Sequence, residues 1–240
     1  MEDKIKINDI ITKMAHDFAS IPEPDRERAI RYALDLGRGL KIIRTYPQGV
    51  TVYGSARLRE DNKYYKAARK LGNLLAQNGH AVITGGGPGI MEAANRGAYE
   101  YGGRSIGLNI QLPDEQDTNP YLTDTMEFRY FFSRRVMLTM SSKTYAFFPG
   151  GYGTMDELTE ALVLMQEGKM PRMPVFLYGK SYWRGLDRFI TKMMREKLIN
   201  YGDTKIFKVT DDINEIVRAA EKAGHLKVGE NIYDRANKVM

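Results

Sequence analysis

Residues 80–98 read HAVITGGGPGIMEAANRGA, an apolar run that passes through a glycine-rich loop into a helical pattern. Residues 145–166 repeat this order as YAFFPGGYGTMDELTEALVLMQ. A short apolar strand followed by a glycine loop and a helix is typical of open α/β sheets, which bind ligands beyond the carboxyl ends of their strands. The two stretches therefore predict an α/β fold with two anion-binding loops.

The same alternation extends outward from these stretches, from Val50 to Thr210. It predicts a Rossmann-like parallel sheet with helices on both faces, plus an N-terminal helical extension. The predicted strands are Val50–Tyr53, Ala81–Thr84, Ser105–Asn109, Met126–Phe128, Thr144–Phe148, Pro174–Tyr178 and Ile206–Val209. The predicted helices of this unit are Tyr64–Gln77, Gly89–Tyr101, Phe132–Ser141, Thr154–Gln166, Trp183–Lys197 and Ile213–Ala223.

The chain divides into an extension at residues 1–46, a nucleotide-binding catalytic domain at 47–224 and a loosely held tail at 225–240. In the extension, Pro22 and Pro24 separate two helical patterns, the second from about Asp25 to Ile43. We expect a helical hairpin that packs against the core or a neighbouring subunit. One face of its first helix carries Ile7, Ile10, Ile11, Met14 and Phe18.

Composition excludes several classes of protein. The sequence contains no cysteine, which rules out disulfides, a thiolate nucleophile and cysteine-ligated metals. Lys and Arg number 36 against 30 Asp and Glu, but they are scattered, so we expect a surface that favours anions rather than a nucleic-acid interface. The sequence lacks a long apolar stretch and a signal-peptide core, so we expect a cytoplasmic protein without membrane contact.

The familiar phosphate and metal motifs are absent. A dinucleotide fingerprint started at Gly85 meets Ile90 at its last glycine position, and one started at Gly87 meets Glu92. The triphosphate-binding P-loop fails because Pro174 stands where its first glycine should be. The three histidines, His16, His80 and His225, are far apart, so surface or packing roles are expected, and neither a catalytic metal nor a cofactor is predicted.

The two glycine motifs, residues 85–98 and 149–157, resemble in order and spacing the paired motifs of the Lonely Guy (LOG) family. The resemblance covers about residues 50–178. It implies a phosphoribohydrolase that cleaves nucleoside 5′-monophosphates, such as AMP or its N6-substituted cytokinin forms, to free base and ribose 5-phosphate. Many members were formerly labelled lysine decarboxylases.

The resemblance also implies roles for individual residues. Arg134 and Glu157 match the catalytic arginine and glutamate. The expected substrate contacts are Gly86, Gly87, Glu92, Arg135, Gly150, Gly151, Gly153, Thr154 and Asp156. The chemistry suits these types, since a carboxylate stabilises positive charge at C1′ and activates water, while a guanidinium stabilises the departing base or grips phosphate. A helix-surface ion pair is the alternative for Arg134 and Glu157.

Some positions depart from the family pattern. Plant-type members begin with a Cys-Gly-Ser-Ser turn where this chain has Tyr53-Gly-Ser-Ala-Arg57, and they commonly have glutamate at Asp156. The polar segment Asn109–Asp124 is expected to fold over the base or ribose.

Two other functions stay open. A nucleotide or molybdenum-cofactor carrier would share the fold but has no need of a carboxylate facing C1′. A pyridoxal-phosphate lysine decarboxylase would need a Schiff-base lysine with an acidic partner, a pattern not found here.

We expect a homodimer or larger assembly. The series Leu158, Ala161, Leu162 and Met165 suits either a two-fold contact or the core of one subunit.

Overall fold

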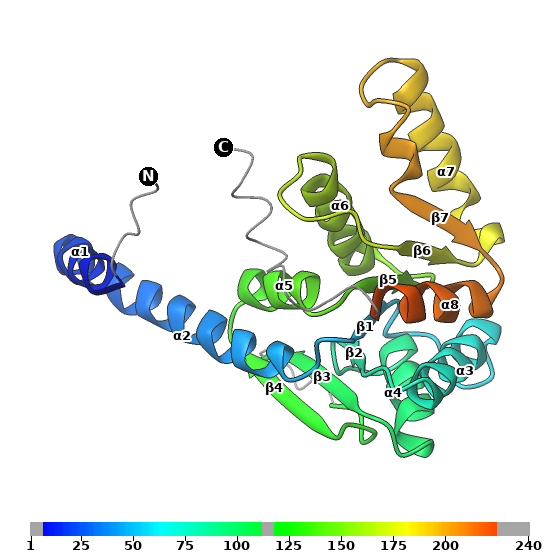
Figure 1. Cartoon of the computed structure of the whole chain (residues 1–240), viewed down its shortest axis with the longest axis horizontal. Helices are drawn as coiled ribbons and strands as arrows, with labels where there is room; N and C mark the ends of the chain where they lie inside the picture. Colours follow the sequence, from blue (N-terminus) through cyan, green and yellow to red (C-terminus); the bar gives the residue numbers. More distant parts are fainter. Residues whose placement is uncertain (1–6, 112–117, 225–240) are drawn as a thin grey trace.

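The computed structural model of the chain describes residues 7–111 and 118–224. Its strands form one seven-stranded parallel sheet in the order β4-β3-β2-β1-β5-β6-β7 (Figure 1). The strands are β1 (Val50–Tyr53), β2 (Val82–Thr84), β3 (Ser105–Ile110), β4 (Asp124–Phe128), β5 (Thr144–Phe147), β6 (Val175–Tyr178) and β7 (Phe207–Thr210). The chain winds outward from β1 to β4 and restarts at β5 on the other side of β1. Ligands of open α/β sheets bind at such a reversal, here between β1 and β5.

Helices cover both faces of this sheet. On one face α3 (Lys63–Gln77), α4 (Ile90–Glu100) and α8 (Ile213–Gly224) pack against alternate strand residues such as Val50 and Val52. On the other face lie α5 (Phe131–Met140), α6 (Tyr152–Gln166), α7 (Lys180–Arg195) and the end of α2 (Asp25–Arg44). All four residues of β1 are buried because successive side chains point into opposite covered faces. The predicted Rossmann-like α/β fold is confirmed.

The boundaries agree with the sequence-based ones to within a few residues. The largest difference is at α7, which begins at Lys180 rather than Trp183; β4 and α6 each begin two residues earlier than predicted. A short 3-10 helix, Asp203–Lys205, precedes β7 and was not predicted.

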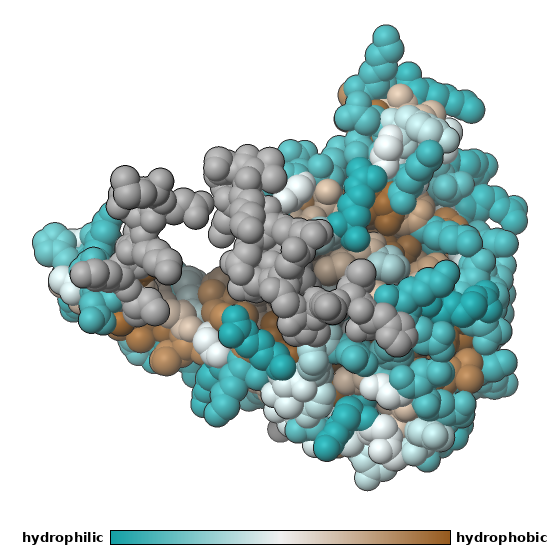
Figure 2. Space-filling view, viewed as in Figure 1, coloured by the Kyte–Doolittle hydropathy of each residue, from teal (hydrophilic) through white to brown (hydrophobic). Residues whose placement is uncertain are grey.

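The N-terminal helices form an arm rather than the expected hairpin. The helix α1 (Ile7–Ser20) does not lie back along α2, and it sits at the far end of α2 from the sheet (Figure 1). The second half of α2 is fixed to the sheet body, because Asp35 accepts hydrogen bonds from Arg129 N and Ser133 Oγ, each 3.1 Å long. Hydrophobic surface remains visible along the arm in Figure 2, where the exposed apolar residues are Ile10, Ile11, Met14, Ile30 and Leu34.

The structure also tests smaller expectations. His80 is buried and its Nδ1 lies 3.1 Å from Gln48 O, a packing role, whereas His16 is exposed. His225, the tail at 225–240 and residues 112–117 of the polar segment lie outside the described residues. Within residues 7–111 and 118–224, no helix is long and apolar enough to cross a membrane.

Candidate active site

Three loops meet at the carboxyl edge of the sheet. The loop after β1 bridges the two glycine loops, because Ser55 N donates to Pro149 O (3.0 Å) and Ser55 O accepts from Ile90 N (2.9 Å). The sequence thus brings both predicted glycine loops to one edge, beside the point where the winding of the sheet reverses.

The first glycine loop is held in place by buried polar side chains. Thr84 Oγ1 accepts from Gly86 N (2.9 Å), and Asn119 Nδ2 donates to the carbonyl oxygens of Gly86 (3.0 Å) and Gly87 (3.2 Å). Gly86 has φ of 73°, and a Cβ there would lie 2.0 Å from Asn109 Oδ1. Glycine is therefore required at this turn.

The second glycine loop leads into the N-terminus of α6. A Cβ at Gly150 would lie 2.1 Å from Thr154 Oγ1, so the backbone packs directly on this buried threonine. Gly151 and Gly153 face open space. The sequence pattern predicted a helix from Thr154, but α6 begins at Tyr152 and its N-cap is Gly151. The free N–H groups of the first turn and the positive end of the helix dipole suit an anion.

Arg134 on α5 and Glu157 on α6 face each other at this edge. Arg134 Nε donates to Leu108 O (2.6 Å) and Nη2 donates to Gly85 O (3.2 Å), so the guanidinium is fixed by β3 and by the loop that follows β2. Its Nη1 lies 3.9 Å from Glu157 Oε1, and the two side chains are 13% and 16% exposed. The pair is therefore mostly buried, which argues against a helix-surface ion pair.

Burial changes the ionisation of both groups. It raises the pKa of Glu157 to about 7, although Arg134 opposes this rise, while Asp156 and Glu160 add to it. Burial lowers the pKa of Arg134, and Glu157 raises it. A carboxyl group that titrates near neutral pH can both accept and return a proton, which is the property of a general acid–base catalyst.

Arg135 and Asp156, both predicted substrate contacts, bind each other. Arg135 Nη1 donates to Asp156 Oδ2 over 2.6 Å, and Arg135 Nε lies 2.6 Å from Glu160 Oε2. These pairs join α5 to α6 directly beside Arg134 and Glu157. The first effect of Arg135 is therefore to hold the two helices together. Glu160 was not predicted, because its signal is only its place one turn after Glu157.

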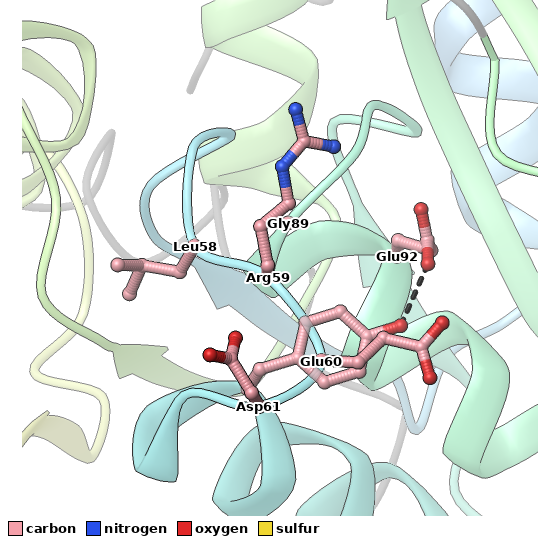
Figure 3. A pocket seen from close by; sticks show the side chains of 7 residues that line it. Leu58, Arg59, Glu60, Asp61, Gly89 and Glu92 are labelled. Atoms are coloured by element: carbon pink, nitrogen blue, oxygen red, sulfur yellow. Dashed lines mark hydrogen bonds between the residues drawn. The ribbon is translucent and has the colours of Figure 1, made fainter.

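Glu92 is hydrogen-bonded to Tyr65 and forms no ion pair with Arg134. Its Oε1 accepts a hydrogen bond from Tyr65 Oη (2.6 Å) in the first turn of α4, drawn as a dashed line in Figure 3. This carboxylate faces a cavity of about 390 Å³ on the α3 and α4 side of the sheet. The cavity is lined by Leu58, Arg59, Glu60, Asp61, Tyr65, Gly89 and Glu92.

Tyr53, the last residue of β1, was not predicted as a site residue. Its ring is 3% exposed and stacks on Phe147 with centroids 4.4 Å apart. Burial raises the pKa of the Tyr53 phenol well above its usual value; Glu157 raises it further and Arg134 lowers it. The phenol is thus within electrostatic reach of the pair. From sequence alone, a tyrosine that ends a buried strand is indistinguishable from a core residue.

The apolar series on α6 lies inside the subunit. Leu158, Ala161 and Met165 are at most 2% exposed, and Leu158 and Met165 belong to the core cluster between the sheet and α6. The intramolecular alternative is therefore correct for these residues, and a contact between subunits would need other side chains. Among the described residues, no group of three or more His, Asp or Glu could hold a metal ion.

A family model described as "possible lysine decarboxylase" matches residues 91–220, more than half of the chain. The chain belongs to this family. The matched residues include Arg134, Glu157 and the second glycine loop, and they begin in α4, just after the first glycine loop.

Relatives within the family carry the LOG name. One is the cytokinin riboside 5′-monophosphate phosphoribohydrolase LOG7 of Arabidopsis thaliana, 29% identical over 164 residues, which are 66% of this chain and 74% of the relative. LOG5 of the same plant is 24% identical over 184 residues, 76% of this chain and 81% of the relative. The resemblance to the Lonely Guy family is confirmed, and these relatives are named as hydrolases.

Several solved structures share the fold of this chain. The molybdenum cofactor carrier protein of Chlamydomonas reinhardtii aligns with a TM-score of 0.57 at 24% identity, over 74% of this chain and 98% of that one. DNA processing protein A of Streptococcus pneumoniae aligns with a TM-score of 0.50 at 17% identity, over 73% of this chain and 62% of that one. At these identities the likeness concerns the fold alone.

Proposed function

We propose that the chain is a phosphoribohydrolase that cleaves the N-glycosidic bond of AMP or N6-substituted AMP. The observation that carries this proposal is the Arg134–Glu157 pair, with 3.9 Å between Nη1 and Oε1, mostly buried between two glycine loops. A binding protein without chemistry gains nothing from burying a carboxyl group whose pKa is raised to about 7. The names of the relatives support the same reaction.

The phosphate of the nucleotide binds at the N-terminus of α6 in this proposal. Gly151 and Gly153 leave open space there, and the helix supplies backbone N–H donors. The sugar then extends toward Glu157, which lies one and a half turns further along the same helix. In this proposal C1′ lies against the Glu157–Arg134 pair, with the first glycine loop beside the base.

The proposed reaction is a displacement at C1′ with strong oxocarbenium character. Glu157 accepts a proton from water as the water oxygen bonds to C1′, and its negative charge stabilises the positive sugar. The C1′–N bond breaks and its electron pair moves onto the ring nitrogen, where Arg134 stabilises the developing charge. The proton taken by Glu157 then passes to the base. Water has thus supplied hydroxide to the sugar and a proton to the leaving group.

The direct test is incubation of the purified protein with AMP, isopentenyl-AMP and other purine and pyrimidine monophosphates, with free base measured by chromatography. Glu157→Gln and Arg134→Ala should each abolish base release. Glu167→Gln, which changes an exposed carboxyl group on the residue that caps α6, should retain it. Tight nucleotide binding without release from any monophosphate would contradict the hydrolase and support a carrier.

We also propose that residues 47–224 act as the catalytic unit and that the arm of α1 and α2 assembles at least two chains. The support is the exposed apolar surface of the arm, including Ile11 (58%) and Leu34 (59%). Soluble proteins seldom leave such residues together on a projecting helix, and two-fold symmetric dimers are the commonest assembly.

A further inference from the structure

We propose that Tyr53 is a further substrate contact, whose hydroxyl donates a hydrogen bond to the sugar of the bound nucleotide beside Glu157. This inference rests on the proposed function and names a contact that the glycine motifs do not contain.

The position of Tyr53 is the first argument. It ends β1, the central strand at which the winding of the sheet reverses, and its partner in the ladder is Phe147 at the end of β5. The last residue of each of these strands borders the ligand crevice of such folds. The Tyr53 side chain belongs to the core face covered by α5 and α6, the helices that carry Arg134 and Glu157.

The ring is held firmly in place. It lies nearly parallel to the ring of Phe147, with an interplanar angle of 8° and centroids 4.4 Å apart. With 3% of the residue exposed, the phenol has one packed orientation and its oxygen has a fixed position. A fixed donor at a site where charge develops needs no reorganisation when the substrate arrives.

The hydroxyl has no partner within the protein. Among residues 7–111 and 118–224, none forms a hydrogen bond with Tyr53 Oη, and Oη is not one of the fully enclosed unpaired atoms. The oxygen therefore reaches accessible space although the rest of the residue is buried. Buried tyrosines normally place this group on a partner, since leaving it unpaired is unfavourable. A sugar oxygen that reaches this position would be its hydrogen-bond partner.

The surroundings decide what kind of atom that partner is. Burial and the nearby Glu157 both raise the pKa of the phenol, so at neutral pH it keeps its proton and acts as a donor. The phosphate is bound at the α6 N-terminus in the proposed function, and the group beside Glu157 is the ribose. A neutral donor next to a carboxylate suits a sugar hydroxyl oxygen.

Tyr145 provides the matched control. It is also a buried tyrosine of the central strands, at 1% exposure, but its hydroxyl donates to Thr139 O and Ser142 O. Tyr145→Phe therefore removes bonds within the protein and should lower Tm with little effect on KM. Tyr53→Phe removes no such bond, so its Tm should equal that of the natural protein.

The experiment measures kcat, KM and Tm of the natural protein, Tyr53→Phe and Tyr145→Phe with AMP and with 2′-deoxy-AMP. We expect Tyr53→Phe to lower kcat/KM for AMP roughly 5- to 30-fold, as for loss of one hydrogen bond in a closed site, without a change in Tm. A larger loss of kcat/KM with AMP than with 2′-deoxy-AMP would identify the 2′-hydroxyl as the acceptor, whereas equal losses would identify another sugar oxygen. Either result supports the contact. Unchanged kcat/KM, or a loss matched by a lower Tm, would overturn the proposal.

A calorimetric arm separates this inference from the reaction itself. AMP binding is measured in Glu157→Gln with and without Tyr53→Phe, so that no turnover is needed. If the natural protein releases no base but Tyr53→Phe weakens AMP binding several-fold, the hydrolase fails and the contact stands. If base is released and the Tyr53→Phe change affects neither turnover nor binding, the contact fails and the hydrolase stands.

Discussion

Replacing Glu157 by glutamine should make the protein inactive and, above neutral pH, more stable. Burial raises the pKa of this carboxyl group from 4.5 to about 7 in the folded state, so folding favours the protonated form. Between pH 4.5 and about pH 7 the folded chain binds more protons than the unfolded chain. The free energy of unfolding therefore falls as pH rises through this range. Glutamine imitates the protonated carboxyl group and carries no such cost.

The size of the effect follows from the two pKa values. At about 1.4 kcal/mol for each tenfold change in the proton equilibrium, the difference between 4.5 and about 7 corresponds to about 3 kcal/mol. The free energy of unfolding of Glu157→Gln should exceed that of the natural protein by about 1 kcal/mol at pH 5. The difference should reach about 3 kcal/mol at pH 8, where the folded carboxyl group is also ionised. For a chain of this size, the change between the two pH values shifts Tm by roughly 4–8 °C.

Urea unfolding followed by circular dichroism at pH 5, 6, 7 and 8 measures this difference directly. Glu167→Gln, on the exposed residue that caps α6, should show no comparable rise with pH. A Glu157→Gln protein whose stability relative to the natural chain is the same at every pH would refute the argument that burial of this carboxyl group controls its ionisation.

Four other predictions concern the loops, helices and arm. Arg134→Lys cannot keep both carbonyl contacts, so base release should fall about 100-fold or more, and activity within tenfold of the natural level would contradict the assigned role. Arg135→Ala should lower the free energy of unfolding by less than about 1 kcal/mol in urea titrations, because its ion pairs are partly exposed; a larger loss would mean that it supports the core. Gly86→Ala should lower Tm clearly, whereas Gly151→Ala should keep Tm but weaken AMP binding in calorimetry; equal Tm values would show that the first loop tolerates a side chain. Leu34→Asp should shift light scattering toward the mass of one chain at micromolar concentration, and an unchanged mass would place the subunit contact elsewhere.

The sequence was sufficient for the fold because periodicity and loop chemistry act locally. Alternating apolar runs marked every strand, and the glycine motifs marked the edge where Arg134 and Glu157 meet. Contacts between distant segments left no such signal. The amide of Asn119 that fixes the first glycine loop lies far along the chain from Gly86, and Tyr53 reads as an ordinary core residue. The hydrogen bond that Tyr65 on α3 donates to the Glu92 carboxylate has no sequence signal either.

The same limit applies to apolar patterns. The series on α6 has the spacing of an interface, yet Leu158 and Met165 fill the core of the subunit. Periodicity identifies which face of a helix is buried, but it does not identify the surface that buries it. In the arm, α1 and α2 do not pack along each other as a hairpin. The sequence could not predict this, because an apolar repeat of three to four residues does not specify which surface it packs against.

The pairing of β1 with β5 has a consequence for synthesis of the chain. Every other neighbouring pair in the sheet joins strands that are consecutive in sequence, whereas β1 waits for β5 across the whole segment that contains β2, β3 and β4. While the ribosome is still translating that segment, β1 is an open edge with unpaired N–H and C=O groups, and such edges pair readily with other chains. The nascent protein is therefore most prone to aggregate before Phe147 has emerged from the ribosomal exit tunnel, and the pairing that ends this exposure also brings Tyr53 beside Phe147.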